Sequence, residues 1–131
     1  MNIEELREYC ISLPDVTEGF PFDETTLVFK VNGKMFLLTD LEGPLSINVK
    51  CEPERAIELR MQYNSVKPGY HMNKNTWNTV EIDGSINDKE LYQWIRDSYD
   101  LVKKKKSEKK LTFLILNFLL FYFIDIKEQI S

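Results

Sequence analysis

The chain has 131 residues, of which 43% are hydrophobic and 29% are charged, and its net charge is −4. This length fits one domain and excludes a multidomain enzyme, while the composition excludes a disordered or collagen-like chain. The charge is uneven, because residues 1–102 hold 10 Lys and Arg against 18 Asp and Glu, whereas residues 103–131 hold 7 Lys and 3 acids. We therefore expect an acidic domain over residues 1–102 and a separate tail, basic and then apolar, over residues 103–131.

The chain begins with a predicted amphipathic helix that ends before Pro14. Asn2 and Glu5 have the spacing of a helix-capping pair, and apolar residues at helical spacing follow them. The opposite face of this helix is acidic, and a charged face of an amphipathic helix is usually the solvated one.

The segment 18–24 has two interpretations. Phe20 and Phe22 flank a proline, and the acids Asp23 and Glu24 follow. The segment is predicted to be a rigid crossover whose two rings pack beneath the sheet, because buried aromatic side chains dominate core energetics. The alternative is the lip of a pocket, with one of the two acids as a metal ligand or base.

A hairpin and a further strand are predicted next. Residues 27–31 alternate as a strand does, and Asn32-Gly33 supplies the two positive-φ positions of a type I′ turn before a return strand over residues 34–40. Residues 45–50 alternate apolar and polar side chains over a whole strand.

The second half of the domain is predicted as helix, turn, strand and helix. The second helix begins at Glu52-Pro53, a type II turn lies at residues 67–70, a strand spans residues 77–82, and the third helix begins at Asn87. The apolar stripe of the third helix consists of Leu91, Trp94, Ile95, Tyr99 and Val102. Helices at both ends of an antiparallel sheet predict an α+β fold, a two-layer sandwich with the N- and C-terminal helices on one face.

The sequence has few signs of catalysis or of metal binding. It contains no Gly-rich phosphate loop, no Ser nucleophile elbow and no Cys/His metal-ligand spacing, and His71 is its only histidine. We therefore expect a protein that is not an enzyme and that carries no cofactor or metal. Cys10 and Cys51 are not in a CxxC spacing and no secretory signal precedes them, which predicts reduced thiols in a cytoplasmic protein.

Residues 70–78 form the densest stretch of polar and aromatic side chains. In one interpretation Tyr70 or Trp77 stacks on a nucleic-acid base whose edge Asn73 or Asn78 reads, or the loop grips a small polar ligand. In the other interpretation, which we favour, Trp77 begins a strand and fills the core, while the Asn side chains satisfy backbone groups of turns.

Four motifs in order carry a resemblance to a known family. They are Phe20-Pro21-Phe22, Thr26-Leu27-Val28-Phe29-Lys30-Val31, Ser46-Ile47-Asn48-Val49-Lys50-Cys51 and Pro68-Gly69-Tyr70-His71-Met72-Asn73-Lys74. With their neighbours they resemble the MmcQ/YjbR family over about residues 1–102. The resemblance implies a bacterial frataxin-like α+β fold with a double-wing sheet, and the DNA binding with which family members are usually labelled. Family members often carry a second His where this chain has Thr76, so a ligand role of that His would be lost here.

DNA binding requires clustered cations, because each Lys–phosphate contact releases counterions and the body of this chain is strongly acidic. The lysines that we expect to gather are Lys30, Lys34, Lys50, Lys67 and Lys74. The candidate nucleic-acid or ligand-binding surface consists of these lysines together with Tyr70, His71, Asn73, Trp77 and Asn78. We expect weak, salt-sensitive binding to DNA at most, and the alternative is a small-ligand or metal-binding protein of frataxin-like fold.

The tail has three interpretations. A run of four lysines, 103–106, forms a basic arm, and 12 of the 14 residues over 111–124 are apolar. In the first, the tail is a replaced or out-of-frame C-terminus, because A-rich Lys codons invite slippage. In the second, it is a helix that packs on the body or on a second copy of the chain. In the third, it is a membrane anchor. We rank the anchor last, since 14 helical residues span only about 21 Å of a roughly 30 Å hydrocarbon core. Self-association through the apolar tail is therefore expected rather than membrane insertion.

Overall fold

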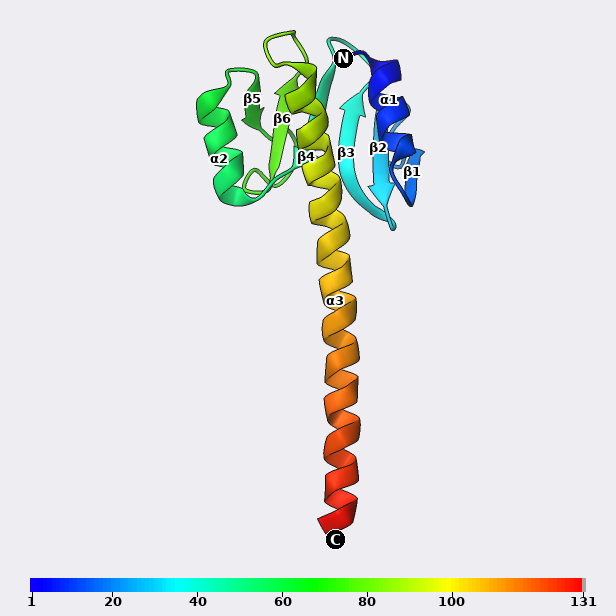
Figure 1. Ribbon diagram of the computed structural model, residues 1–131. Helices are drawn as coiled ribbons and strands as arrows, with labels where there is room; N and C mark the ends of the chain where they lie inside the picture. Colours follow the sequence, from blue (N-terminus) through cyan, green and yellow to red (C-terminus); the bar gives the residue numbers. More distant parts are fainter. Residues whose placement is uncertain (131) are drawn as a thin grey trace.

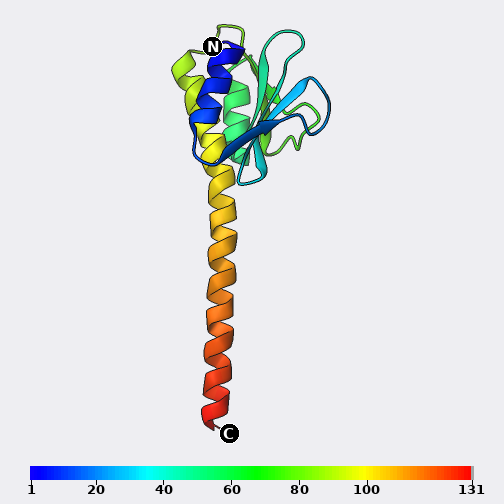
Figure 2. The same ribbon diagram turned by 90° about the vertical axis from the view of Figure 1, so that its right-hand side faces the viewer.

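The computed structural model describes the backbone of residues 1–130 and the side chains of residues 1–104 and 111–129. Within this part of the chain, three helices lie on one side of a six-stranded sheet, which Figure 2 shows edge-on. The elements in chain order are α1 (Ile3–Ser12), β1 (Val16–Gly19), β2 (Thr26–Val31), β3 (Lys34–Asp40), β4 (Ser46–Lys50), α2 (Pro53–Gln62), β5 (Val66–Pro68), β6 (Trp77–Glu81) and α3 (Asp88–Ile130). The predicted α+β sandwich with both terminal helices on one face is confirmed.

The sheet is antiparallel throughout, with the strand order β1-β2-β3-β4-β6-β5 (Figure 1). Its centre is built from β3 and β4, and its edges are the short strands β1 and β5. The crossover from β4 passes through α2 and β5 before the chain returns as β6 beside β4. This order places the loop before β2 and the loop before β6 on opposite sides of β3 and β4.

Local signals account for most of the element boundaries. The side chain of Asn2 accepts from the backbone N–H of Glu5, whose carboxylate accepts in return from the backbone N–H of Asn2, so α1 has the predicted capping box. Asn32 and Gly33 have φ values of 52° and 81°, as a type I′ turn requires. Asn87 accepts from the backbone N–H of Glu90 and thereby caps α3.

Two edge strands were not predicted, and one predicted turn is wrong. Neither β1 nor β5 was expected, because strands of four and three residues are too short to show alternation. A turn was predicted at residues 67–70, with Gly69 in the left-handed region. Instead, the chain continues as β5 to Pro68, and the positive φ of 57° belongs to His71.

The main core lies between the sheet and the helices. It contains the inward-facing residues of β2 to β6 and the predicted stripe of α3, with Leu6 and Cys10 of α1 and Leu59 of α2. A second, smaller cluster of Val28, Leu38 and Trp77 lies on the other face of the sheet, where Met35 and Met72 pack against it. We call that other face the open face, because no helix of the described chain covers it (Figure 2).

The tail continues α3 away from the domain (Figure 1). Val102 is the last residue of α3 that is buried among the described side chains, and the apolar side chains over residues 111–124 are all more than half exposed. The described tail therefore does not pack on its own body, as one interpretation had it. No described helix is long and apolar enough to cross a membrane. In the basic arm, the Lys103 ammonium donates to the Tyr99 hydroxyl, and the side chains of residues 105 and 106 lie outside the described part.

Candidate functional site

Two loops meet over the open face and enclose a groove. One is the β1–β2 loop, residues 20–25, and the other is the β5–β6 loop, residues 69–76. The space between them has a volume of about 480 Å³. The residues that line it are Phe22, Asp23, Thr25, Thr26, Leu38, Asp40, Asn48, Tyr70, His71 and Met72. We call this space the open-face groove. The two segments that the sequence marked as separate candidates thus contribute to one site.

The phenylalanines of the β1–β2 loop lie at the surface. Phe20 is 49% exposed and Phe22 is 64% exposed, so the prediction that both rings pack beneath the sheet is wrong. The reason is that Val28 and Leu38, together with Trp77, already fill that face of the sheet. The pocket-lip alternative describes the position of Phe22 better, because its ring borders the open-face groove.

Asp23 holds the β1–β2 loop in shape. Its carboxylate accepts hydrogen bonds from the backbone N–H groups of Thr25 and Thr26, at 2.9 and 2.6 Å, and from both Thr hydroxyls. These bonds, with the N–H of Thr26 foremost, lower the pKa of Asp23. Asp23 is therefore a negatively charged structural residue, and its hydrogen bonds position Phe22 beside it.

The β5–β6 loop is held in place by close packing at Gly69 and by hydrogen bonds to its backbone. A Cβ atom on Gly69 would lie 2.8 Å from the Cβ of Trp77, so the close approach of the two strands requires glycine there. The Lys74 ammonium donates to the Gly69 carbonyl at 3.3 Å, and the Lys74 carbonyl accepts from Arg60 at 2.9 Å. The side chain of Asn73 accepts from the backbone N–H of residue 75, which is the turn role that we favoured for it.

Tyr70 and His71 form the wall of the groove opposite Phe22. Their ring centroids are 4.0 Å apart with the planes tilted by 54°, and Tyr70 is 71% exposed. The backbone N–H of Tyr70 donates to the Thr79 hydroxyl on β6, which fixes the start of the turn. The positive φ of His71 then places both side chains at the surface. The wall is therefore a ring pair held in place by its backbone.

The floor of the groove is formed by outward-facing residues of β3 and β4. Leu38 is apolar, and Asn48 beside it accepts a hydrogen bond of 2.5 Å from the Thr79 hydroxyl. Asp40 ends β3, and one of its carboxylate oxygens accepts from the backbone N–H of Glu42 at 2.9 Å. Its second oxygen has no hydrogen-bond partner within the described chain and is available to a ligand.

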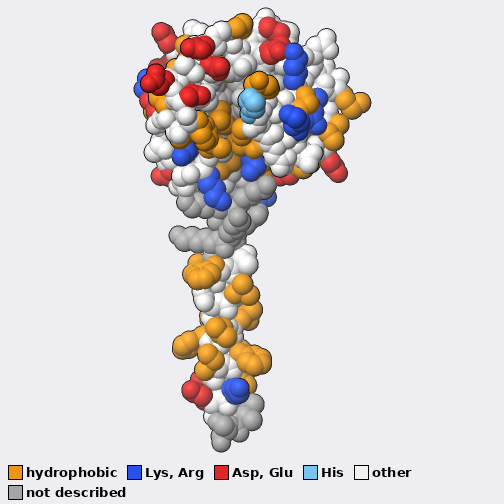
Figure 3. Space-filling model, turned by 180° about the vertical axis from the view of Figure 1, so that it is seen from behind, with side chains coloured by type: hydrophobic (Ala, Val, Ile, Leu, Met, Phe, Trp, Pro, Cys, Tyr) orange, Lys and Arg blue, Asp and Glu red, His pale blue; other side chains and the backbone are white. Residues whose placement is uncertain are grey.

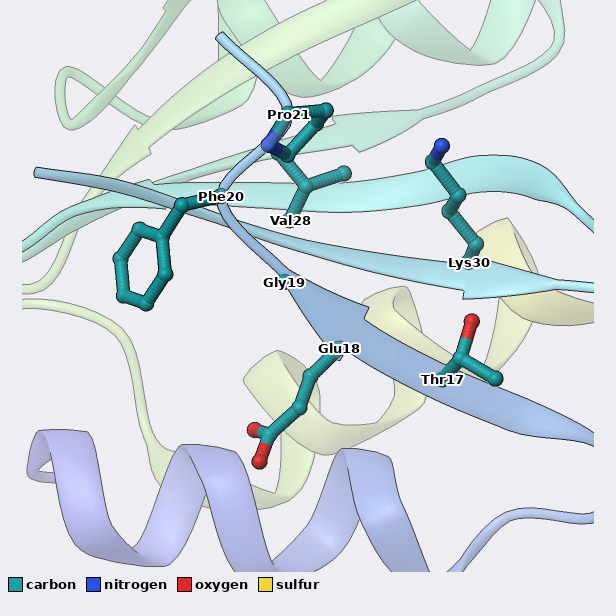
Figure 4. Close-up of a pocket in the computed structure, with 7 residues that line it drawn as sticks. All are labelled: Thr17, Glu18, Gly19, Phe20, Pro21, Val28 and Lys30. Atoms are coloured by element: carbon teal, nitrogen blue, oxygen red, sulfur yellow. The ribbon is translucent and has the colours of Figure 1, made fainter. Parts of the chain in front are cut away.

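A second hollow adjoins the groove on the β1 side of the open face (Figure 4). It has a volume of about 290 Å³, and its lining includes Thr17, Phe20, Val28 and Lys30. In Figure 4 the Pro21 ring lies over Val28, while the Lys30 side chain extends from β2 beside Thr17. Val28 of this hollow pairs with Leu38 of the groove floor, so the two spaces rest on neighbouring residues of β2 and β3.

The five lysines of the candidate surface do not form one patch. The Lys67 ammonium forms an ion pair with Glu81 at 2.7 Å, and the Lys74 ammonium donates to the Gly69 carbonyl within its own loop. Lys34 pairs with Val31, whose side chain is in the helix-side core, so strand alternation turns Lys34 away from the face that carries Lys30. Lys50 lies at the end of β4, paired with Trp77. On the open face, Figure 3 shows apolar side chains beside the histidine in the middle and separate groups of acids and cations around them.

Two proposed base-reading residues are buried. Trp77 begins β6 and is 7% exposed in the second cluster, so its ring is not available for stacking. Asn78 is 1% exposed and faces the helices, where its amide nitrogen donates to the carbonyl of Ala56 at 3.2 Å. Of the five non-lysine residues in the candidate surface, only Tyr70 and His71 line the groove.

The groove offers no metal cluster within the described residues, since no three His, Cys, Asp or Glu side chains there could hold one ion. The thiols lie elsewhere. Cys10 is fully buried on the inward face of α1, and burial raises its pKa to about 12. Cys51 is half-buried at the end of β4, and burial also raises its pKa. Neither thiol has the lowered pKa of a reactive cysteine.

Sequence reasoning missed the polar residues of the groove. Thr26, Asp40 and Asn48 were treated as parts of strands and not as candidates. The signal that could have found Asn48 was present, because residues 46, 48 and 50 are the polar side of the cleanest strand alternation in the chain. An alternating strand shows which side chains avoid the core, but not which loops from elsewhere will lie over them.

Comparison with known proteins gives one consistent result. The YjbR family model matches residues 11–101. The "Uncharacterized protein YjbR" of Escherichia coli K12 is 32% identical over 116 residues, which cover 88% of this chain and 98% of that protein. The "Uncharacterized protein YbdF" of Escherichia coli O157:H7 is 38% identical over 100 residues, which cover 76% of this chain and 82% of that protein.

Solved structures agree with the sequence comparison. The Deinococcus radiodurans protein DR2400, with a DUF419 domain, is 44% identical and superposes with a TM-score of 0.77 over 80% of each chain. A Pseudomonas syringae protein is 28% identical with a TM-score of 0.69, covering 78% of this chain and 99% of its own. The matched family segment ends one residue before Val102, which belongs to the core of the domain.

Proposed function

The chain belongs to the YjbR family, and we propose that it is a non-enzymatic binding protein that holds a small organic ligand in the open-face groove. The observation that carries the proposal is the convergence of two loops, distant in sequence, around one space of about 480 Å³. That volume lies within the roughly 300–1,000 Å³ of small-molecule sites. Exposed rings on two walls and a few polar groups on the floor suit a ligand that is partly apolar.

The hydrogen bonds that the polar groups of the groove already make within the protein favour binding over catalysis. The hydroxyls of Thr25 and Thr26 donate to Asp23, whose lowered pKa makes it a weak general base for either hydroxyl. Asp23 accepts four hydrogen bonds from its own loop. The groups that remain for a ligand include one oxygen of Asp40 and the ring pair of Tyr70 and His71, which are groups for recognition.

An NMR titration with small aromatic fragments tests this function. In a ¹⁵N-labelled sample, we expect the shifted amide signals to belong to the β1–β2 loop, the β5–β6 loop and the floor residues of β3 and β4. Phe22→Ala should weaken binding of the fragments, whereas Phe113→Ala in the tail, an equally exposed ring, should not. Shifts confined to the tail or to the helix face would contradict the proposal.

Nucleic-acid binding is the second candidate, and Lys30 is the observation that favours it. Its ammonium lies on the open face beside a hollow rimmed by the exposed ring of Phe20, and a ring next to a cation suits a single strand. Fluorescence anisotropy with a labelled oligothymidine at low salt should show weak binding that Lys30→Ala reduces. Lys89→Ala, on the helix side, is the matched control; equal losses in both variants would show only general charge attraction.

The remaining proposals concern fold type and location. We propose that the sandwich is the frataxin-like, double-wing arrangement that the family resemblance implies, used here for an organic ligand in preference to a metal. We also propose a cytoplasmic location, supported by the two cysteines, which are both free thiols.

A further inference from the structure

The open-face groove combines aromatic walls with carboxylates, and from this juxtaposition we propose that its ligand is an organic cation, an amine attached to a planar or apolar group. This inference rests on the proposed function and names the ligand class of the same groove. Three features carry it: the charge of the lining, a free carboxylate oxygen, and the exposed rings.

Both side chains of the lining that carry a formal charge, with His71 counted as neutral, are acidic. Asp23 and Asp40 both line the groove, and none of the lining residues in the described chain is Lys or Arg. The hydrogen bonds that Asp23 accepts keep it ionised, so it contributes a fixed negative field. An anionic ligand such as a phosphate or carboxylate would be repelled here, whereas a cation would be attracted.

Asp40 supplies a directed contact. Its turn with Glu42 uses one carboxylate oxygen and thereby fixes the orientation of the group. The other oxygen, unpartnered within the described chain, can accept from an ammonium N–H as a charge-assisted hydrogen bond. Asp40 is exposed at the end of β3, so a ligand reaches it without opening the core.

The rings supply the rest of the binding. Phe22 and Tyr70 border the groove and are more than half exposed, and they come from loops on opposite sides of the floor strands. Ring faces attract cations and also stack on flat apolar groups. Leu38 and Met72 offer apolar contact beneath them. Aromatic walls, apolar contacts beneath them and a free carboxylate are the elements with which proteins bind substituted ammonium groups.

Three ligands of one shape and different charge test the inference. Tyramine carries an ammonium, tyrosol replaces it by a neutral hydroxyl, and 4-hydroxyphenylacetate replaces it by a carboxylate. In NMR titrations at neutral pH and low salt, we expect tyramine to bind about tenfold more tightly than tyrosol. The carboxylate should bind more weakly than tyrosol.

Matched variants locate the source of the preference. Asp40→Asn keeps an oxygen to accept from the N–H of Glu42 but removes the charge, so it should weaken tyramine binding more than tyrosol binding and reduce the preference for tyramine. Glu54→Gln removes one charge from α2 on the helix side and should preserve the preference. Equal effects of the two substitutions would overturn the directed role of Asp40.

The outcomes separate this inference from the function on which it rests. If tyrosol and 4-hydroxyphenylacetate bind at the groove as tightly as tyramine does, the groove binds small organic ligands but the cation preference is wrong. If none of the three shifts the groove signals at millimolar concentration while other neutral aromatic fragments do, the cation inference alone is wrong. If no fragment of any charge binds there, both proposals are wrong.

Discussion

The Ser98 hydroxyl donates a hydrogen bond of 2.5 Å to the backbone carbonyl of Phe36 and accepts one of 2.8 Å from the backbone N–H of Lys50. One buried side chain of α3 thus contacts both central strands of the sheet. The contact lies at a bulge, because Phe29 pairs with Leu37 and the next pair of β2 and β3 skips residue 36. A bulged residue is left out of the strand ladder. The Ser98 hydroxyl therefore gives the Phe36 carbonyl the hydrogen bond that the strand ladder does not provide.

Replacing Ser98 by Ala should lower the free energy of unfolding by about 1–3 kcal/mol, because two backbone groups lose their partner at a buried site. Urea unfolding followed by tryptophan fluorescence measures this change. Ser12→Ala is the control, since its hydroxyl also donates to a backbone carbonyl, that of Tyr9, but at an exposed position. A Ser98 variant no less stable than the control variant would show that the bulge has another partner.

The groove should depend on Gly69 even though no ligand contact is assigned to it. An alanine there would place its Cβ 2.8 Å from the Cβ and 3.0 Å from the carbonyl oxygen of Trp77. The β5–β6 loop must then shift. The free energy of unfolding should fall by about 1–3 kcal/mol, and fragment binding at Tyr70 should be lost. A Cβ atom at Gly19, in edge strand β1, would meet no atom within 4 Å, so Gly19→Ala should keep both the stability and the fragment binding. Unchanged loop signals in the NMR spectrum of the Gly69 variant would contradict this prediction.

The sequence predicts this fold well where local chemistry decides. The capping pair of Asn2 and Glu5, the Asn32-Gly33 turn and the stripe of α3 each depend on near neighbours in the chain, and all three occur in the structure. The edge strands escaped prediction because their pairing is a tertiary event. Four residues of β1 become a strand only because β2 lies beside them.

The candidate site was predicted only in parts, for a related reason. Tyr70 and His71 could be found from the density of polar and aromatic residues in their loop. Phe22 was placed in the core because an apolar ring is more often buried than exposed, and a single sequence does not show that Trp77 fills that space. The convergence of the two loops follows from strand order, which sequence periodicity does not reveal.

Acid should weaken the fold partly through Asp83. Hydrogen bonds from the hydroxyl and N–H of Ser85 and from the Ser65 hydroxyl lower the pKa of Asp83 from its usual 3.8 to about 2. Because the unfolded chain binds this proton more readily, the stabilisation is complete above about pH 4 to 5 and is lost as the pH falls towards 2.

Urea unfolding at several pH values between 2 and 5 measures the contribution of Asp83. Asp83→Asn should be less stable than the unchanged chain at pH 5, and the difference should shrink as the pH falls. Ser85→Ala, which removes the first of the donors, should move stability in the same direction. A difference that grows on acidification would reverse the assigned sign.

The two thiols should differ in their exposure to alkylating reagents. Cys10 is fully buried and has a pKa raised to about 12, so native protein at pH 8 should leave it unmodified by iodoacetamide. Cys51 is half-buried, with a smaller rise in pKa, and should react slowly. Peptide mass spectrometry distinguishes the two sites, and modification in urea should reach both. Rapid native modification of Cys10 would mean that α1 opens from the sheet far more readily than its packing indicates.

The tail should be dispensable for folding and should drive self-association. A helix that is apolar on all sides is normally buried, and residues 111–124 expose their apolar side chains around the whole helix. A second copy of the chain is the occupant that we expect, because packing two such helices together removes these exposed apolar side chains from water. Truncation after residue 106 should leave a monomer with the unfolding midpoint of the full chain, since Val102 is the last of the described α3 residues in the core. Light scattering coupled to size-exclusion chromatography should show larger species for the full chain only, and Phe118→Asp with Phe121→Asp should reduce them without changing the midpoint. An unfolded truncated chain would make the tail part of the core, and a monomeric full chain would refute self-association.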